Sequence, residues 1–219
     1  GDLFDDKFVA DTTIRNVAEI INRSRARWFV LRGNHGVITP YNKLREICNT
    51  CCFFDDQWTT FRMGKTVFCG KELTPDDQQP WGELPIDKDD FNVVVLHGDV
   101  DSAAYGLIDG KALAANPVNY VALGHRHALQ PLTFGRHKGA YCGTLEARGF
   151  DETEPTGFIV VDTVSGDIGF VNQALRRVVT RQVDLSRADS DVAAERIIAD
   201  AVADESPRNY LNLILSGEV

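Results

Sequence analysis

Long apolar runs and an excess of positive charge are both missing from this 219-residue sequence. No apolar run is long enough to cross a bilayer and no signal-like segment opens the chain, so we expect no membrane partner. Lys and Arg total 23 against 32 Asp and Glu, which gives a formal net charge of -9 at pH 7. That balance argues against a protein that coats nucleic acid by bulk electrostatics. It does not exclude a nucleic-acid enzyme, because a local basic patch or bound metal ions can still meet phosphates.

Cysteine and methionine are scarce as well. The five cysteines are an odd number without a disulfide framework, so a reducing cytoplasm is the expected location. Cys48 and Cys51 have the C-x-x-C spacing of zinc and redox sites, but a zinc site needs a second pair, and Cys69 and Cys142 are isolated. Buried free thiols are therefore the favoured interpretation. Met63 is the only methionine, so Gly1 is not an initiator and we expect residues in front of it.

The composition that remains is that of an ordinary globular protein, with 43% hydrophobic and 25% charged residues. At this length, one domain with an appendage is the simplest arrangement. Three short apolar runs are each typical of a buried strand, and each is followed by glycine and ligand-type residues. They are Trp28–Leu31 before Gly33-Asn34-His35, Val93–Leu96 before His97-Gly98-Asp99, and Tyr120–Leu123 before Gly124-His125-Arg126-His127.

Helices and hairpins are predicted for the rest of the chain. Ile14, Val17, Ala18 and Ile21 have the spacing of one buried helix face, with Asp11 as the expected N-cap. Further predicted elements are a helical segment around 44–48, a hairpin over 58–68, a solvated loop over 74–90, a helix over 110–115, paired strands at 132–134 and 140–142, a hairpin around 165–167, and strand, helix and strand at 178–185, 192–202 and 210–215.

The histidines after the predicted strands suggest a metal site. In an extended chain, residues i and i+2 leave on the same side, so His125 and His127 can converge on one point. Neutral imidazoles at a strand end commonly hold a transition-metal ion, and a solvated turn is the alternative. In open α/β sheets the carboxyl ends of strands share one crevice, so Asn34, His35 and His97 could meet there too. Carboxylate, amide and imidazole ligands together suit manganese, iron or zinc better than calcium.

Taken together, these segments resemble a known family. The segments Gly1-Asp2…Asp5, Gly33-Asn34-His35, His97-Gly98 and Gly124-His125-x-His127 resemble, in order and spacing, the second to fifth motifs of the calcineurin-like metallophosphoesterases. The run from Val121 to His127, together with Tyr141-x-Gly143-Thr144-Leu145-Glu146-x-Arg148-Gly149-Phe150-Asp151-Glu152…Gly157-Phe158, is similar to the bacterial DNA-repair exonuclease branch, the SbcD-like nucleases. This resemblance covers nearly the whole chain.

The resemblance implies an α/β fold, namely a metallophosphoesterase-type β-sandwich flanked by helices in four αββα layers and truncated at its N-terminus. Residues 1–175 would form the metallophosphoesterase (nuclease) domain without its first strand and first motif. Residues 176–219 would begin a small strand-helix-strand unit, part of an α+β DNA-capping domain.

The resemblance also implies two divalent metal ions, most simply Mn2+, with Fe2+ or Zn2+ as alternatives. Asp2 would be the carboxylate that bridges the two ions. Asn34, His97 and His125 would complete one site, and His127 would belong to the other. Two such ions can polarise a phosphoryl group, generate hydroxide and support the leaving oxygen.

His35 would be the catalytic residue that contacts the scissile phosphate and protonates the leaving group, because a histidine pKa lies near working pH. Two departures from the family pattern bear on this role. The Asp-x-His of the first motif lies upstream of Gly1, so we expect the chain to bind one ion well and the second poorly. The family usually follows its Asn-His with an acidic residue that orients the histidine, and Gly36 stands there instead. An untethered imidazole samples unproductive tautomers and rotamers, so we expect less efficient catalysis.

Other interpretations of these residues stay open. His35 is alternatively a hydrogen-bonded loop residue, and Asp2 a disordered terminal residue. His137 matches no motif and is expected at the surface. Arg148, Phe150 and Asp151 either form a DNA-facing loop or order the second hairpin.

The leading functional hypothesis is a metal-dependent phosphodiesterase, a nuclease that hydrolyses the DNA backbone in DNA repair. By resemblance it would be a homodimer paired with an ABC-type ATPase subunit that carries a coiled coil. One alternative is a small-molecule phosphatase or cyclic-nucleotide phosphodiesterase on the same metal centre, for which a closed bowl rather than a long groove is expected. The other is a catalytically impaired binding module that has kept the fold.

Overall fold

The computed structural model describes residues 1–4, 8–77, 81–102 and 105–217. Asp5 of the Gly1-Asp2…Asp5 segment therefore lies outside the described residues. The chain divides into two compact units, the first made of Gly1–Cys142 and Val161–Ile168, the second of Gly143–Val160 and Gly169–Val219.

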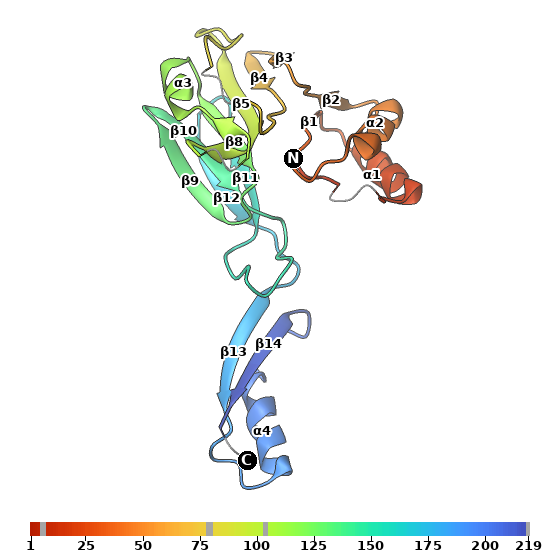
Figure 1. Cartoon of the computed structure of the whole chain (residues 1–219), viewed down its shortest axis with the longest axis vertical. Helices are drawn as coiled ribbons and strands as arrows, with labels where there is room; N and C mark the ends of the chain where they lie inside the picture. Colours follow the sequence, from red (N-terminus) through yellow and green to blue (C-terminus); the bar gives the residue numbers. More distant parts are fainter. Residues whose placement is uncertain (5–7, 78–80, 103–104, 218–219) are drawn as a thin grey trace. The chain divides into compact units, whose positions relative to one another are not determined.

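A six-stranded sheet forms the centre of the first unit (Figure 1). In spatial order its strands are β3 (Thr59–Met63), β4 (Thr66–Gly70), β5 (Phe91–His97), β8 (Tyr120–Gly124), β10 (His137–Cys142) and β9 (Leu129–Phe134). The four inner strands run parallel, and the outer strands β3 and β9 pair antiparallel with their neighbours. Parallel strands place their carboxyl ends at one edge of a sheet, so this topology brings the segments after β5 and β8 together.

The core of the sheet lies around β5 and β8, as the apolar runs predicted. Val94 and Leu96 of β5 and Val121 and Leu123 of β8 are at most 3% exposed. They belong to one hydrophobic cluster with Leu113 of α3 (Gly110–Ala115). The predicted hairpin over 58–68 is confirmed as the antiparallel pair of β3 and β4.

His137 is buried rather than at the surface, which corrects the expectation from sequence. It begins β10 and is 7% exposed, and its ring hydrogen-bonds the backbone of Ala114 and Asn116. A histidine without a motif is here a structural residue that ties β10 to the end of α3.

A smaller layer of helices and strands precedes the sheet in the chain. It contains α1 (Asp11–Arg23), β1 (Trp28–Val30), α2 (Ile38–Ile47) and β2 (Cys51–Phe53), and β1 pairs in parallel with β2. Ile14, Ala18 and Ile21 of α1 are buried with Leu44 of α2 in a second hydrophobic cluster, as the spacing predicted. The Cys48 and Cys51 sulfurs lie 2.7 Å apart beside this cluster, and all five cysteines are free.

Two local predictions in this layer are wrong. Ala10 rather than Asp11 is the N-cap of α1, and it makes no side-chain cap bond. The Asp11 carboxylate instead pairs with Lys43 Nζ of α2 at 2.6 Å. This ion pair explains why the carboxylate does not cap the backbone N–H groups at the start of α1. Trp28 is 40% exposed, so β1 is not fully buried. This strand belongs to a two-stranded sheet with β2, and such a small sheet leaves part of its surface uncovered.

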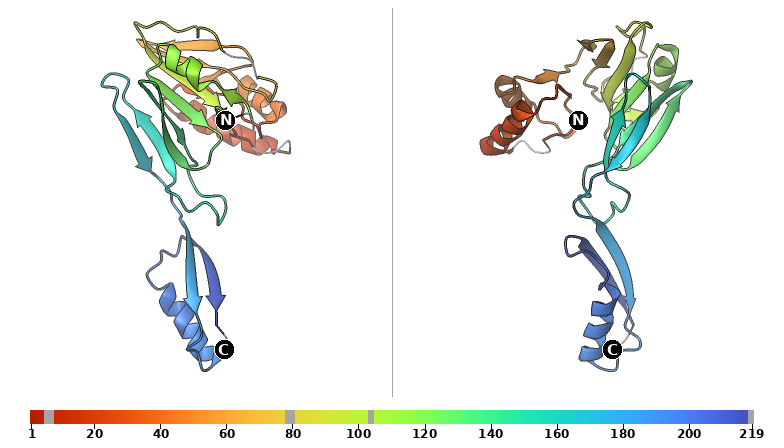
Figure 2. Two further views of the ribbon diagram at one scale, coloured as in Figure 1. Left: turned by 60° about the vertical axis from the view of Figure 1, so that its left-hand side comes forward. Right: turned by 180° about the vertical axis from the view of Figure 1, so that it is seen from behind.

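The second unit contains most of a hairpin and a strand-helix-strand motif, as predicted. The hairpin is β11 (Gly157–Val161) with β12 (Ile168–Asn172), whose connecting turn is counted with the first unit. β13 (Val178–Asp184) pairs in parallel with β14 (Tyr210–Ser216), and α4 (Asp191–Ala201) lies against this pair (Figure 2). The two remaining strands, β6 (Asp99–Val100) and β7 (Leu107–Ile108), form a short parallel pair in the first unit.

The predicted mixed α/β class with a central multistranded sheet and flanking helices is confirmed. Among the described residues, no helix combines the length and apolar character that a membrane span requires. The predicted boundary between residues 175 and 176 stays a prediction.

Candidate metal centre

Two histidines lie side by side at the carboxyl ends of β5 and β8. The parallel register pairs His97 with Gly124, so His125 follows directly beside His97. The two imidazole centroids are 5.2 Å apart, with an angle of 72° between the rings. A Cβ atom at Gly124 would lie 2.8 Å from His97 Nδ1, which is closer than side chains approach. Glycine therefore allows β8 to pass the His97 ring at this distance.

Asn34 joins the two rings through one oxygen atom. Its Oδ1 lies 2.8 Å from His97 Nε2 and 3.0 Å from His125 Nδ1. The structure thus brings these three residues together, although 91 positions separate Asn34 from His125. The sequence argument expected Asn34 to meet His97 at the carboxyl ends of the strands, and it does, although β1 pairs with β2 and does not belong to the six-stranded sheet. The loop after β1 nevertheless carries Asn34 to the edge where β5 and β8 end.

Asp2 contacts the same cluster from the first residues of the chain. Its Oδ2 lies 3.1 Å from His97 Nε2, and its Oδ1 accepts the backbone N–H of His35 at 3.0 Å. A methyl group at Gly33 would overlap the Asp2 carboxylate, so only glycine leaves room for this contact. Asp2 and His125 both have positive φ, at 56° and 105°. Such conformations cost free energy in non-glycine residues and concentrate at functional sites.

Burial and charge set the protonation of this pair. The His97 side chain is 3% exposed and that of Asp2 is 18% exposed. Burial lowers the pKa of His97, although the neighbouring Asp2 carboxylate raises it in part. For Asp2, burial alone would raise the pKa, but hydrogen bonds from His97 and the His35 backbone lower it overall. A neutral imidazole beside an ionised carboxylate is the protonation state in which both groups can bind a cation.

His125 has a second partner on its other side. Asp99 Oδ2 lies 3.3 Å from His125 Nε2, and Arg126 Nη2 lies 3.2 Å from Asp99 Oδ1. Tyr105 also stacks on the His125 ring, with centroids 5.7 Å apart. The sequence analysis assigned no role to Asp99 or Tyr105. Asp99 could have been found, because it stands at i+2 from His97; Tyr105 lies in a loop and has no periodic signal.

His35 and His127 are both exposed. The backbone of His35 is fixed by Asp2, and His127 stands two positions beyond His125. The assignments of His35 to catalysis and of His127 to a second metal site stay predictions.

Gly36 occupies the position at which the resemblance leads us to expect an acidic residue. A methyl group there would overlap the side chain of Arg32, which is held by an ion pair with Glu72 at 3.0 Å. An acidic side chain at Gly36 would therefore require Arg32 to move.

The donor atoms of the cluster suit a divalent cation. Across the residues that the structure describes, histidine, cysteine and carboxylate side chains alone form no group of three that could hold a metal ion. Here the amide oxygen of Asn34 completes the set, because it links His97 with His125 while Asp2 contacts His97. Oxygen and imidazole donors of this kind match Mn, Fe or Zn. We conclude that the residues present fit one such ion.

Comparison with known proteins defines the family to which the chain belongs. The chain belongs to the Calcineurin-like phosphoesterase family, whose profile matches residues 1–129, and members of this family use divalent metal ions. An uncharacterized metallophosphoesterase of Bacillus subtilis strain 168, YhaO, is 28% identical over 116 residues, which is 50% of this chain and 28% of that protein. The chain therefore spans well under half the length of this relative.

A solved structure gives a weaker likeness. The 2.05 Å crystal structure of a Staphylococcus aureus protein provisionally named a 5'-nucleotidase, in complex with alpha-ketoglutarate, shares 15% identity with a TM-score of 0.37. The match covers 84% of this chain and 44% of that one. The family assignment rests on the sequence match over residues 1–129.

Proposed function

We propose that this protein is a metal-dependent phosphodiesterase that cleaves the DNA backbone. The observation that carries the proposal is the contact of Asn34 Oδ1 with both His97 and His125, beside the carboxylate of Asp2. These groups come from distant parts of the sequence and gather at one edge of the sheet. Membership of the phosphoesterase family gives this cluster a reaction class, and the resemblance to SbcD-like nucleases suggests the substrate.

The exposure of the centre favours a polymeric substrate. Asn34, His35, Arg126 and His127 are all exposed in the first unit, so its rim is open on this side. A closed bowl would favour a small ester, whereas an open rim admits a continuous backbone.

Each residue has a defined task in the proposed reaction. Asp2, Asn34, His97 and His125 would hold a divalent ion, for which Mn2+ is the first choice, and His127 would contribute to a second. Bound ions would supply Lewis acidity toward the phosphoryl oxygens and lower the pKa of the attacking water.

His35 would donate a proton to the departing oxygen of the DNA strand. Its backbone N–H donates to Asp2, which places His35 beside the ligand cluster. Its exposed ring can reach a substrate that lies over the rim.

The proposal extends to assembly. The strand-helix-strand motif of β13, α4 and β14 would cap the DNA, and the full-length protein would act as a homodimer with an ABC-type ATPase subunit. Sedimentation of the full-length protein, alone and with such a subunit, tests these partners. A protein that stays monomeric and binds no ATPase would contradict them.

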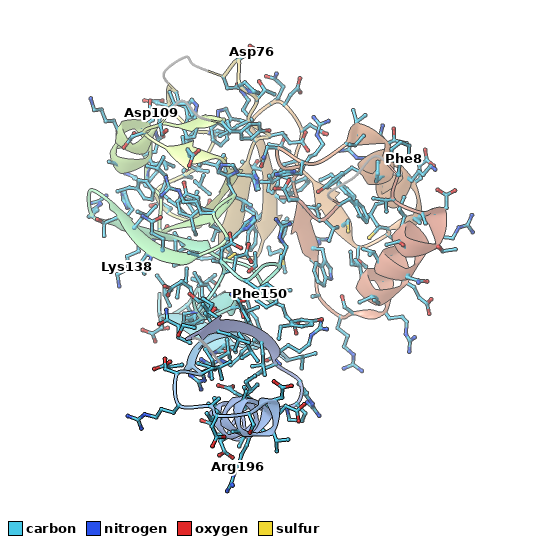
Figure 3. All side chains as sticks on the ribbon, turned by 60° about the horizontal axis from the view of Figure 1, so that its bottom comes forward. Phe8, Asp76, Asp109, Lys138, Phe150 and Arg196 are labelled. Carbon is cyan, nitrogen blue, oxygen red and sulfur yellow. The ribbon has the colours of Figure 1, made fainter. Side chains whose placement is uncertain are left out.

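The test is cleavage of labelled double-stranded and single-stranded DNA by the natural full-length protein with Mn2+. We expect cleavage that EDTA abolishes and that His35→Asn lowers by about a hundredfold or more, because the proton donor is lost. Lys138→Ala is the matched control, since this exposed residue lies on β10 and outside the cluster (Figure 3). Intact activity on mononucleotide esters without DNA cleavage would overturn the DNA assignment and favour the small-molecule enzyme. Inactivity on both substrates would favour a binding module.

A further inference from the structure

The imidazole of His125 is held between two acceptors. Its Nδ1 faces Asn34 Oδ1 at 3.0 Å, and its Nε2 faces Asp99 Oδ2 at 3.3 Å. We propose that Asp99 is a positioning residue that keeps the His125 proton on Nε2 and so directs the Nδ1 lone pair toward the cation site. This inference rests on the proposed function only in taking the cluster as a metal centre.

Asp99 is itself fixed in place, as a positioning residue must be. It is 7% exposed, and Arg126 donates to its Oδ1 from Nε and from Nη2, each at 3.2 Å. Its backbone N–H donates to the carbonyl of Tyr105 at 3.0 Å. Arg126 in turn lies over the ring of Tyr141, 5.2 Å from the centroid. These contacts leave the Asp99 carboxylate little freedom to turn away from His125.

The difference between the two acceptors decides where the proton resides. A neutral imidazole carries one proton, and a hydrogen bond to a carboxylate is stronger than one to a neutral amide oxygen. The proton therefore stays on Nε2, toward Asp99. The lone pair of Nδ1 then faces Asn34 Oδ1, and two lone pairs at 3.0 Å repel each other unless a cation lies between them.

A comparison with His97 shows why this contact matters for His125. His97 Nδ1 is buried and has no hydrogen-bond partner among the described residues, so its ring is held by burial and by the groups at Nε2. The His125 side chain is 22% exposed and its backbone has a φ of 105°. A partly exposed ring on a strained backbone needs a side-chain partner to keep its direction. Such partners typically change metal affinity about 10–100-fold when removed.

The test uses the 219-residue chain with Asp99→Asn, Asp99→Leu and a control. Asparagine keeps an acceptor oxygen without the charge, and leucine removes the acceptor at similar size. Asp101→Asn is the matched control, because Asp101 directly follows β6 and its carboxylate accepts the N–H of Gly110 instead. Its φ of 52° is tolerated by asparagine, so this variant should fold.

Two readouts separate positioning from a merely structural role. The first is the 15N shift of the His125 ring in the metal-free chain near pH 8, which reports the tautomer directly. We expect the Nε2–H form in the parent chain and a shift toward Nδ1–H in Asp99→Leu, because only Asn34 then accepts a proton. The second is the Mn2+ dissociation constant, expected to rise about tenfold in Asp99→Asn and up to about a hundredfold in Asp99→Leu.

The outcomes are distinct from those that test the proposed function. If Asp99→Leu keeps the Nε2–H tautomer and both variants bind Mn2+ within twofold of Asp101→Asn, the inference is overturned. If Asp99→Leu does not fold, Asp99→Asn decides alone: unchanged Mn2+ affinity with an unchanged ring shift rejects the inference. Neither readout involves DNA, so absent DNA cleavage would reject the nuclease proposal and leave this one standing.

Discussion

The two units differ in how much apolar surface they bury. Apart from Val183 and Leu185, all buried hydrophobic residues in the described part of the chain lie in the first unit. In the second unit, α4 has no buried residue, and its neighbouring strand β14 leaves Ile214 and Leu215 nearly half exposed. Arg196 of α4 points away from the β13–β14 pair (Figure 3).

The difference explains why the candidate metal centre lies where it does. A ligand set needs side chains held to fractions of an ångström, and close-packed surroundings provide that. His97 follows the fully buried Leu96 and lies beside Gly124, whose backbone is fixed in the sheet. The second unit is held mainly by the β13–β14 ladder and by partly buried ion pairs such as Arg181 with Glu205. Its small core predicts lower stability and earlier local opening.

The largest expected effect is a core truncation in the first unit. Leu96→Ala removes a side chain that is 1% exposed, and we expect the free energy of unfolding to fall by about 3 kcal/mol. The half-buried Leu213 of β14 is the matched site in the second unit, and Leu213→Ala should cost about 1 kcal/mol. Trp28, Trp58 and Trp81 all belong to the first unit, so tryptophan fluorescence follows its unfolding alone.

Amide hydrogen exchange supplies the complementary measurement for the second unit. Amides of β13 and β14 should be less protected against hydrogen exchange than those of β5 and β8. Leu213→Ala should raise the exchange rates of the β13 and β14 amides and leave those of β5 and β8 unchanged. Equal protection in both units, or a loss from Leu213→Ala as large as that from Leu96→Ala, would contradict the comparison.

The next effect comes from metal binding. An ion that binds only the folded first unit stabilises it by about 2.7 kcal/mol at a hundredfold excess over the dissociation constant. We expect Mn2+ to raise the fluorescence-detected unfolding midpoint and to leave the exchange of β13 amides unchanged. His97→Ala should abolish the shift, and Lys138→Ala should keep it. A midpoint that Mn2+ moves equally in His97→Ala would show that the ion binds elsewhere.

The sequence predicted strand and helix identity well where one buried face imposes a period. The apolar runs of β5 and β8 and the spaced apolar residues of α1 are of this kind. It failed where tertiary contacts decide. The Asp11 carboxylate pairs with Lys43 rather than capping α1. His137 is buried, with hydrogen bonds to the backbone of Ala114 and Asn116 at the end of α3.

For the candidate centre, local sequence indicated which residues follow strands, and the resemblance supplied their roles. The histidines after β5 and β8 meet because parallel strands end at one edge, which is a general rule. No such rule could place Asn34, because β1 lies outside that sheet. The contact of Asp99 with His125 likewise depends on φ at His125, which sequence does not determine.

A smaller effect is expected from pH. Burial would raise the pKa of Asp77, but hydrogen bonds from Lys71 at 2.5 Å and from Thr74 lower it below its ordinary value of 3.8. The folded state therefore binds this proton less readily than the unfolded state. The stabilisation is complete above the ordinary pKa and is lost as pH falls through the lower folded pKa. Asp77→Asn should cost about 1 kcal/mol at pH 6, with a loss that shrinks in acid.

Asp184 is the matched carboxylate in the second unit. Its pKa is also lowered, by hydrogen bonds from the hydroxyl and the backbone N–H of Ser186. Because this carboxylate is exposed, Asp184→Asn should change the stability of the second unit much less. Chemical denaturation at pH 3, 4 and 6 checks both variants. A cost for Asp77→Asn that stays constant over this range would reject the assigned cause.

The smallest effects concern the N-caps of α3 and α4, both of which make side-chain hydrogen bonds. Asp109 accepts the N–H groups of Lys111 at 3.0 Å and Ala112 at 2.9 Å, and α3 buries Leu113 behind it. Ser190 accepts only the N–H of Ala193, at 3.4 Å, on a helix without buried residues. We expect Asp109→Ala to lower the unfolding free energy by about 1 kcal/mol and Ser190→Ala by about 0.5 kcal/mol.

The probes should separate these caps by unit. The first loss should appear in fluorescence-detected unfolding, and the second only in the exchange of α4 amides. Because α4 gains little from burial, a larger loss from Ser190→Ala than from Asp109→Ala would mean that local capping, rather than the core, stabilises the second unit.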